Sequence, residues 1–206
     1  ATEDGRSYYR FSKVLKSLNL RFDSILPSEI ERYDGDLVFT TEKEAPEYTD
    51  IPLLTDDISI ENLTVLRGKI LEKLDDVRLE DELIMGIDPG KRTGFSAYFL
   101  GSEIANSLYM TIDKLIDEII SILSQLRAKK RLIKIGNGDM KLTNKITNLL
   151  NLRYCSDFDV EIVDESKTTV KIKHFNQRGK RDMLSARYIS QRTGDIHSVL
   201  PLSRVG

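Results

Sequence analysis

The chain has 206 residues, of which 40% are apolar and 31% charged, and its net charge is −2. This composition is typical of a globular protein, and no apolar run approaches the roughly 18 to 20 residues that a membrane helix needs. Cys155 is the single cysteine, so an internal disulfide is excluded and a reducing, cytoplasmic setting is expected.

The charge is divided unevenly along the chain. Residues 1–82 carry 20 acidic and 11 basic side chains, whereas residues 83–206 carry 13 acidic and 20 basic ones. A basic half on an acidic protein favours a polyanionic partner for that half, because the local field guides association with nucleic acid. An equally simple interpretation is that these lysines and arginines only keep the domain soluble.

The N-terminal part, residues 1–78, is predicted to be a small α/β domain. A helix is predicted at 6–20, where apolar residues recur at three- and four-residue steps. Short strands are predicted between turn signals at 22–26, 37–41 and 51–54. A second amphipathic helix follows at 60–74. No catalytic constellation is recognisable in this domain, and its role is left open.

The pattern changes at Leu83, and residues 79–206 are predicted to form a second domain. Three short strands joined by Gly-containing turns are followed by alternating helices and strands. The expected elements are strands 83–88, 94–100 and 103–110, helix 112–126, strand 131–136, helix 142–152, strand 160–165 and helix 181–192. The order βββαβαβα predicts a mixed sheet flanked by helices, with an active site at the carboxyl ends of its strands.

Four motifs in this domain, in this order, resemble the RuvC/YqgF branch of the RNase H-like fold. "GIDPGKRTG" (86–94) resembles the first-strand motif, most closely in the YqgF-like domain of Tex proteins, and "IGNGD" (135–139) resembles an element after their fourth strand. "DESKTT" (164–169) is similar to a YqgF motif, and "RDMLSARYIS" (181–190) to the last helix of the superfamily. The resemblance covers about residues 83–193 and implies an RNase H-like domain.

The resemblance implies a metal-dependent nuclease that cuts structured DNA or RNA, as Holliday junction resolvases do. Two divalent ions roughly 4 Å apart would activate a water and neutralise the phosphate, and Mg²⁺ (or Mn²⁺) prefers carboxylate ligands. The candidate catalytic and metal-binding residues are Asp88, Glu165 and Asp182. Asp139 is a further metal candidate, although RuvC-type sites have their acid earlier, where this chain has Gly-Asn-Gly.

Each acid also has an ordinary structural interpretation. Asp88 would end the central strand, with Gly90 and Gly94 leaving room for a phosphate and a metal ion, or it would only accept backbone hydrogen bonds in an Asp-Pro-Gly turn. Glu165 would reach the same metals from a neighbouring strand, or cap the next segment. Asp182 would begin the last helix and point toward the sheet, or simply suit the helix dipole in the first turn.

Basic residues around these acids are expected to bind the nucleic-acid backbone. Residues 166–181 carry six Lys or Arg side chains and no acid, and they would hold several phosphates. The candidates are Lys91, Arg92, Lys167, Thr168, Thr169, Lys171, Lys173, Arg178, Lys180 and Arg181. The alternative is a solvated loop without a partner.

Two functional hypotheses remain open at this stage. The first is the nuclease, for which symmetric cutting of a four-way junction would require a homodimer. The second is a catalytically inactive nucleic-acid-binding or scaffold module of the Tex/YqgF type, favoured by the missing fourth acid. No membrane partner is expected under either hypothesis.

Overall fold

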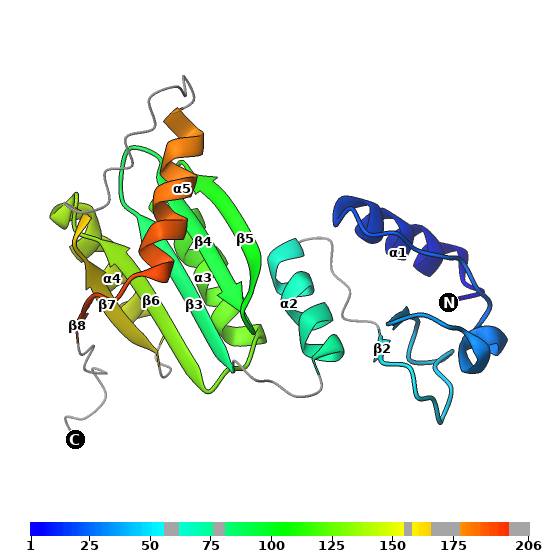
Figure 1. Ribbon diagram of the computed structural model, residues 1–206. Coiled ribbons are helices and arrows are strands. Elements are labelled where there is room, and N and C mark those ends of the chain that lie inside the picture. Colours follow the sequence, from blue (N-terminus) through cyan, green and yellow to red (C-terminus); the bar gives the residue numbers. More distant parts are fainter. Residues whose placement is uncertain (56–61, 76–80, 155–157, 166–177, 198–206) are drawn as a thin grey trace. The chain divides into compact units, whose positions relative to one another are not determined.

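The computed structural model describes residues 1–55, 62–75, 81–154, 158–165 and 178–197 (Figure 1). The chain divides into two compact units, Ala1–Arg78 and Leu79–Gly206. Among the described residues, no helix is both long enough and apolar enough to cross a membrane.

The first unit packs two helices around a very small sheet. Its elements are α1 (Gly5–Ser17), the 3₁₀ helix η1 (Pro27–Arg32), β1 (Val38–Phe39), β2 (Leu53–Leu54) and α2 (Leu63–Leu74). β1 and β2 pair in parallel. The core consists of apolar side chains from α1, β1, β2 and α2: Phe11, Val14, Leu18, Phe39, Leu54, Leu66 and Ile70.

Most of the elements predicted for this unit are present, but the strand predicted at 22–26 is wrong. That segment has no regular secondary structure. Leu26 is half exposed and precedes η1, so the apolar residues here do not form the buried alternation of a strand. The strands predicted at 37–41 and 51–54 are present but shorter, as β1 and β2.

The second unit contains the predicted order βββαβαβα, with one further strand at its end. Its elements are β3 (Glu82–Asp88), β4 (Thr93–Phe99), β5 (Ser102–Tyr109), α3 (Ile112–Gln125), β6 (Lys130–Gly136), α4 (Met140–Arg153), β7 (Asp159–Val163), α5 (Arg178–Gln191) and β8 (Asp195–His197). The sheet order is β5-β4-β3-β6-β7-β8. β3 pairs antiparallel with β4 and parallel with β6, so the predicted mixed sheet is confirmed.

Helices cover both faces of this sheet. α5 crosses one face over β3 and β4, and α3 and α4 lie on the other face (Figure 1). In β3, Leu83, Met85 and Ile87 are fully buried, and the intervening Gly86 lies under α5. Since side chains alternate along a strand, Asp88 points to the α5 side, as Gly86 does.

The backbone of α5 lies unusually close to the sheet because the residues beneath it are small. A Cβ on Gly86 would collide with the carbonyl oxygen of Ala186, and a Cβ on Gly94 would collide with that of Asp182. The Ser96 hydroxyl donates a buried 2.9 Å hydrogen bond to the Ala186 carbonyl oxygen. The expectation that Gly94 leaves room for a ligand is therefore wrong, since the α5 backbone takes that space.

A buried lysine holds the C-terminal end of α5 on the sheet. Lys134 lies in β6, where its ammonium donates to the Arg192 carbonyl oxygen just beyond α5 and lies 3.7 Å from a Glu161 carboxylate oxygen. The same Glu161 oxygen accepts a 3.1 Å hydrogen bond from the Gly194 backbone. The charges of this pair are thus matched inside the fold, as burial of a lysine requires.

Candidate active site at the end of β3

Asp88 is the last residue of β3 and pairs directly with Gly94 of β4. It is partly buried on the α5 side of the sheet. Its pKa is raised to about 7, first by burial and then by the negative charges of Glu165 and Asp182, while a hydrogen bond from Ser185 partly offsets this rise. Two carboxylates from distant parts of the chain are therefore close enough to act on Asp88.

Glu165 is held by the loop that follows β6. The Asn137 side-chain oxygen accepts from the Glu165 backbone N–H at 3.0 Å, and the Gly138 N–H donates to Glu165 Oε1 at 3.0 Å. A Cβ on Gly138 would lie 2.6 Å from Glu165 Oε2, and one on Gly136 would collide with Oε1. The glycines of "IGNGD" are thus explained by the carboxylate that lies over them, while the neighbouring Asp164 is exposed.

The position of Asp182 corrects one expectation. α5 begins at Arg178, so Asp182 lies in the second turn and no acid occupies the first. The interpretation that Asp182 only complements the helix dipole in the first turn is therefore wrong. Its Oδ2 lies 4.0 Å from Arg92 Nε, and its backbone is fixed against Gly94. Asp182 therefore approaches Asp88 because of how α5 packs on β4.

Asp139 has a structural task in this conformation. It is the N-cap of α4, and its Oδ1 accepts from the Leu142 N–H at 3.1 Å. The Thr143 hydroxyl ties the same helix to the loop by donating a buried 2.7 Å hydrogen bond to the Gly136 carbonyl oxygen. We therefore leave Asp139 out of the group that surrounds Asp88.

The basic candidates can be placed only in part. Lys91, Lys180 and Arg181 are exposed, and Arg92 is partly exposed beside Asp182. The other candidates lie outside the described residues or have side chains that are not described: Lys167, Thr168, Thr169, Lys171, Lys173 and Arg178. The four placed residues flank Asp88 and Asp182 in sequence, so positive charge borders the acidic group.

Carboxylate oxygens are the ligands that Mg²⁺ prefers, so the chemistry of Asp88, Glu165 and Asp182 fits a divalent cation. As the side chains are placed, no group of three or more His, Cys, Asp or Glu residues within the described ranges is close enough to hold an ion. The acids interact through their charges and would have to approach one another to share a cation.

Two residues of the group were missed from the sequence. Ser185 hydrogen-bonds Asp88 and lies three positions after Asp182, on the same side of α5. Asn137 lies inside a motif that was recognised, but its task depends on β7, because its N–H donates to the Val163 carbonyl oxygen at 3.0 Å. The spacing of three residues from Asp182 could have identified Ser185 from the sequence. No local pattern identifies Glu165 as the partner of the Asn137 side chain.

No protein-family model matches the chain, and a search of curated proteins finds no significant relative. The likeness of its motifs to the RuvC/YqgF branch therefore stays a prediction. The function has to be argued from the geometry around Asp88.

Replacing Asn137 with alanine should loosen Glu165. The substitution removes the acceptor of the Glu165 N–H, and the loss of this partly buried hydrogen bond should lower the free energy of unfolding by about 1 kcal/mol. Urea unfolding followed by circular dichroism measures this change. Asn144→Ala on the exposed side of α4 is the control and should cost nothing. Equal stability of the Asn137 variant and the original protein would contradict the role given to this side chain.

Proposed function

We propose that residues 79–206 form an RNase H-like domain of the RuvC/YqgF type, which hydrolyses phosphodiester bonds in structured DNA or RNA with the help of a divalent metal ion. The fold part is supported by the sheet. The antiparallel strands β5, β4 and β3 are followed by β6 and β7, which continue in parallel on the other side of β3. This arrangement agrees with the resemblance of the four motifs.

One observation carries the functional part, namely the convergence of Glu165 and Asp182 on Asp88. The pKa of Asp88 is raised by burial and by the charges of Glu165 and Asp182, which come from separate motifs. Like charges are costly to gather in a partly buried place, so a fold that gathers them has a use for the resulting field. A divalent cation would relieve that repulsion.

The residues can be given separate tasks in this proposal. Asp88, Glu165 and Asp182 would hold Mg²⁺ or Mn²⁺, which when bound supplies charge neutralisation on the phosphate and an activated water. Arg92, beside Asp182, and the exposed Lys91, Lys180 and Arg181 would bind the phosphates that flank the scissile bond. Asn137 and Gly138 position the Glu165 carboxylate.

The test is a cleavage screen over branched DNA, single strands and structured RNA with Mg²⁺ or Mn²⁺. Asp88→Asn should lower the rate by at least about a hundredfold, because it removes a metal ligand that contributes several kcal/mol to the transition state. Asp113→Asn, the same chemical change at an exposed position of α3, should cleave normally. Cleavage by the Asp88 variant at the original rate would end the proposed metal mechanism.

A second function is favoured by a different observation. Asp139 caps α4, and the described acids do not form a ready-made metal group. A catalytically inactive nucleic-acid-binding module, which binds backbone and cuts nothing, fits these two findings. Calorimetry decides between the two: absence of Mg²⁺ and Mn²⁺ binding at millimolar concentrations, together with salt-dependent binding of DNA or RNA, would favour the inactive module.

A further inference from the structure

The charges of the first unit are segregated along its sequence. Residues 5–21 contain five basic side chains and no acid, whereas residues 22–78 contain 15 acidic and six basic ones. Four of the five basic residues belong to α1. This net acidic unit therefore has one helix, α1, that carries four basic side chains and no acid.

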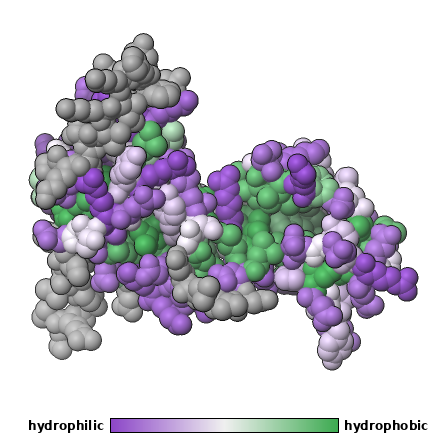
Figure 2. All heavy atoms as spheres, in the orientation of Figure 1, coloured by the Kyte–Doolittle hydropathy of each residue, from purple (hydrophilic) through white to green (hydrophobic). Residues whose placement is uncertain are grey.

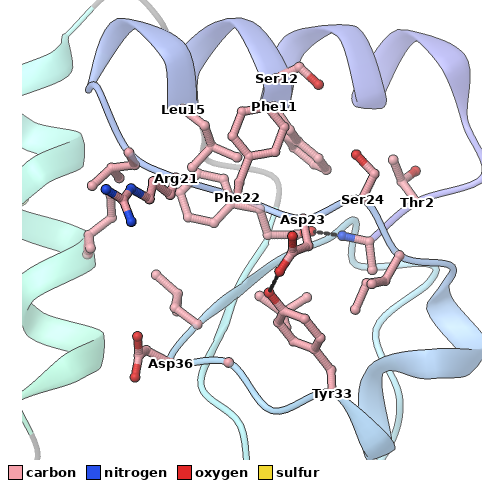
Figure 3. Close-up of a pocket in the computed structure, with 18 of the residues that line it drawn as sticks. Thr2, Phe11, Ser12, Leu15, Arg21, Phe22, Asp23, Ser24, Tyr33 and Asp36 are labelled. Atoms are coloured by element: carbon pink, nitrogen blue, oxygen red, sulfur yellow. Dashed lines mark hydrogen bonds between the residues drawn. The ribbon is translucent and has the colours of Figure 1, made fainter.

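The inner side of α1 is committed to the core. Ser7, Phe11 and Val14 are buried. Phe11 and Leu15 extend from the helix into a cavity of about 370 Å³ that lies below it (Figure 3). The orientation of α1 about its own axis is thereby fixed, and its other side must face solvent.

The outer side of α1 carries a regular stripe of exposed residues. Arg6, Tyr9, Lys13 and Lys16 follow one another at steps of three, four and three, so they share one side of the helix. Tyr9 is 68% exposed. Hydrophilic side chains cover the outer side of this helix, above apolar ones (Figure 2). We call these four residues the α1 basic face.

The cations of this face form no close ion pair with a carboxylate of the described residues, although the charge of Arg6 acts on the nearby Asp4 carboxylate. Across the part of the chain that the structure describes, no ion pair joins Arg6, Lys13 or Lys16 to a carboxylate. The nearest acid in sequence, Asp4, is the N-cap of α1, and its Oδ2 accepts a 2.8 Å hydrogen bond from the Ser7 N–H. Three exposed cations thus lie along about 15 Å of helix, given a rise of 1.5 Å per residue.

We propose that the α1 basic face is a second nucleic-acid-binding surface, which takes a single-stranded segment. The cations would contact two or three successive phosphates, and the exposed Tyr9 ring would stack on an unpaired base. Acidic side chains elsewhere in the unit would repel the strand and so confine it to this helix. The proposal rests on the proposed function of residues 79–206, because it takes nucleic acid as the partner of the whole chain.

The experiment uses the full chain in EDTA, so that binding is measured without cleavage. Fluorescence anisotropy follows a labelled 30-nucleotide single strand as salt is varied. The variant combines Arg6→Glu, Lys13→Glu and Lys16→Glu. The matched control combines Arg32→Glu, Lys43→Glu and Lys73→Glu, which are exposed positions of the same unit outside α1 and change the net charge equally.

The α1 variant should bind at least about tenfold more weakly, and its salt slope should fall by about two, since each lost phosphate contact removes roughly 0.7. Tyr9→Ala should weaken binding by about five- to tenfold without changing the slope. The control should bind within about twofold of the original protein. The neutral set Arg6→Gln, Lys13→Gln and Lys16→Gln repeats the test if the charge-reversed helix does not fold.

Three results would overturn the proposal: unchanged binding by the α1 variant, equal weakening by the control, or a change in oligomeric state by light scattering, which would make the face a protein contact. A fifth variant, Lys91→Glu with Lys180→Glu and Arg181→Glu, separates this test from that of the nuclease. If only that variant loses binding, the α1 surface is excluded while the proposed function stands. If the protein binds strands through α1 yet never cleaves, the nuclease proposal fails alone.

Discussion

Asp88→Asn should make the protein more stable at pH 8 and leave its stability unchanged near pH 4. The pKa of Asp88 is raised from 3.8 to about 7, first by burial and then by Glu165 and Asp182. A raised pKa means that the folded state holds the proton more tightly than the unfolded chain. The stability that this proton contributes is complete below about pH 4 and is lost as the pH rises through 7.

The size of the effect follows from the same shift. About three pH units correspond to roughly 4 kcal/mol, and the partial exposure of the side chain reduces this to about 2 kcal/mol. Asparagine has the shape of the protonated acid but cannot ionise. The variant therefore avoids the free-energy cost of ionising a partly buried carboxyl group at pH 8. Urea unfolding in EDTA at pH 4 and pH 8 measures the difference.

Controls separate this electrostatic effect from general changes in packing. Asp50→Asn, at an exposed position outside the helices and strands, should change the free energy of unfolding by the same small amount at both pH values. Millimolar Mg²⁺ at pH 8 should narrow the gap between the original protein and the Asp88 variant, because a bound cation would relieve the same repulsion. The explanation would be contradicted if Asp88→Asn gained as much stability at pH 4 as at pH 8, or gained none at pH 8. Either result would show that the fold does not raise the pKa of Asp88.

Much of the second unit could be predicted because the spacing of apolar residues within each helix or strand is a local signal. In α3, the residues at helical spacing are those that become buried, including Leu115, Ile116, Ile119 and Leu123. In β3, an apolar run that ends on an acid placed Asp88 at the carboxyl end of a strand. Both signals depend on near neighbours in the chain, and sequence periodicity records such neighbours directly.

The rest depends on contacts between distant segments. Lys134 interrupts an apolar strand, and only its position beside Arg192 and Glu161 explains its burial. The sequence pattern predicts that the last helix begins at residue 181, whereas α5 begins at Arg178. A glycine such as Gly179 ordinarily interrupts a helical pattern, although α5 continues through it. β8 pairs with β7 through only three residues, a length at which periodicity carries no signal.

Gly94→Ala should destabilise the second unit and, at the same time, move Asp182 away from Asp88. The new Cβ would meet the carbonyl oxygen of Asp182 and lie 2.7 Å from its carbonyl carbon, and both atoms belong to a helix backbone that cannot rotate away. Relief requires α5 to move, against the buried hydrogen bond from Ser96 to Ala186. We expect the free energy of unfolding to fall by about 3 kcal/mol, the upper part of the range for overpacking.

The same displacement would carry Asp182 and Ser185 away from Asp88, since both belong to α5. Cleavage, or Mg²⁺ binding by calorimetry, should therefore fall with stability. Gly90→Ala is the matched control: its Cβ would meet no atom closer than 3.3 Å, so stability should change by less than about 1 kcal/mol. If Gly94→Ala is as stable as Gly90→Ala, then α5 does not lie on β4 as described, and the approach of Asp182 to Asp88 loses its structural cause.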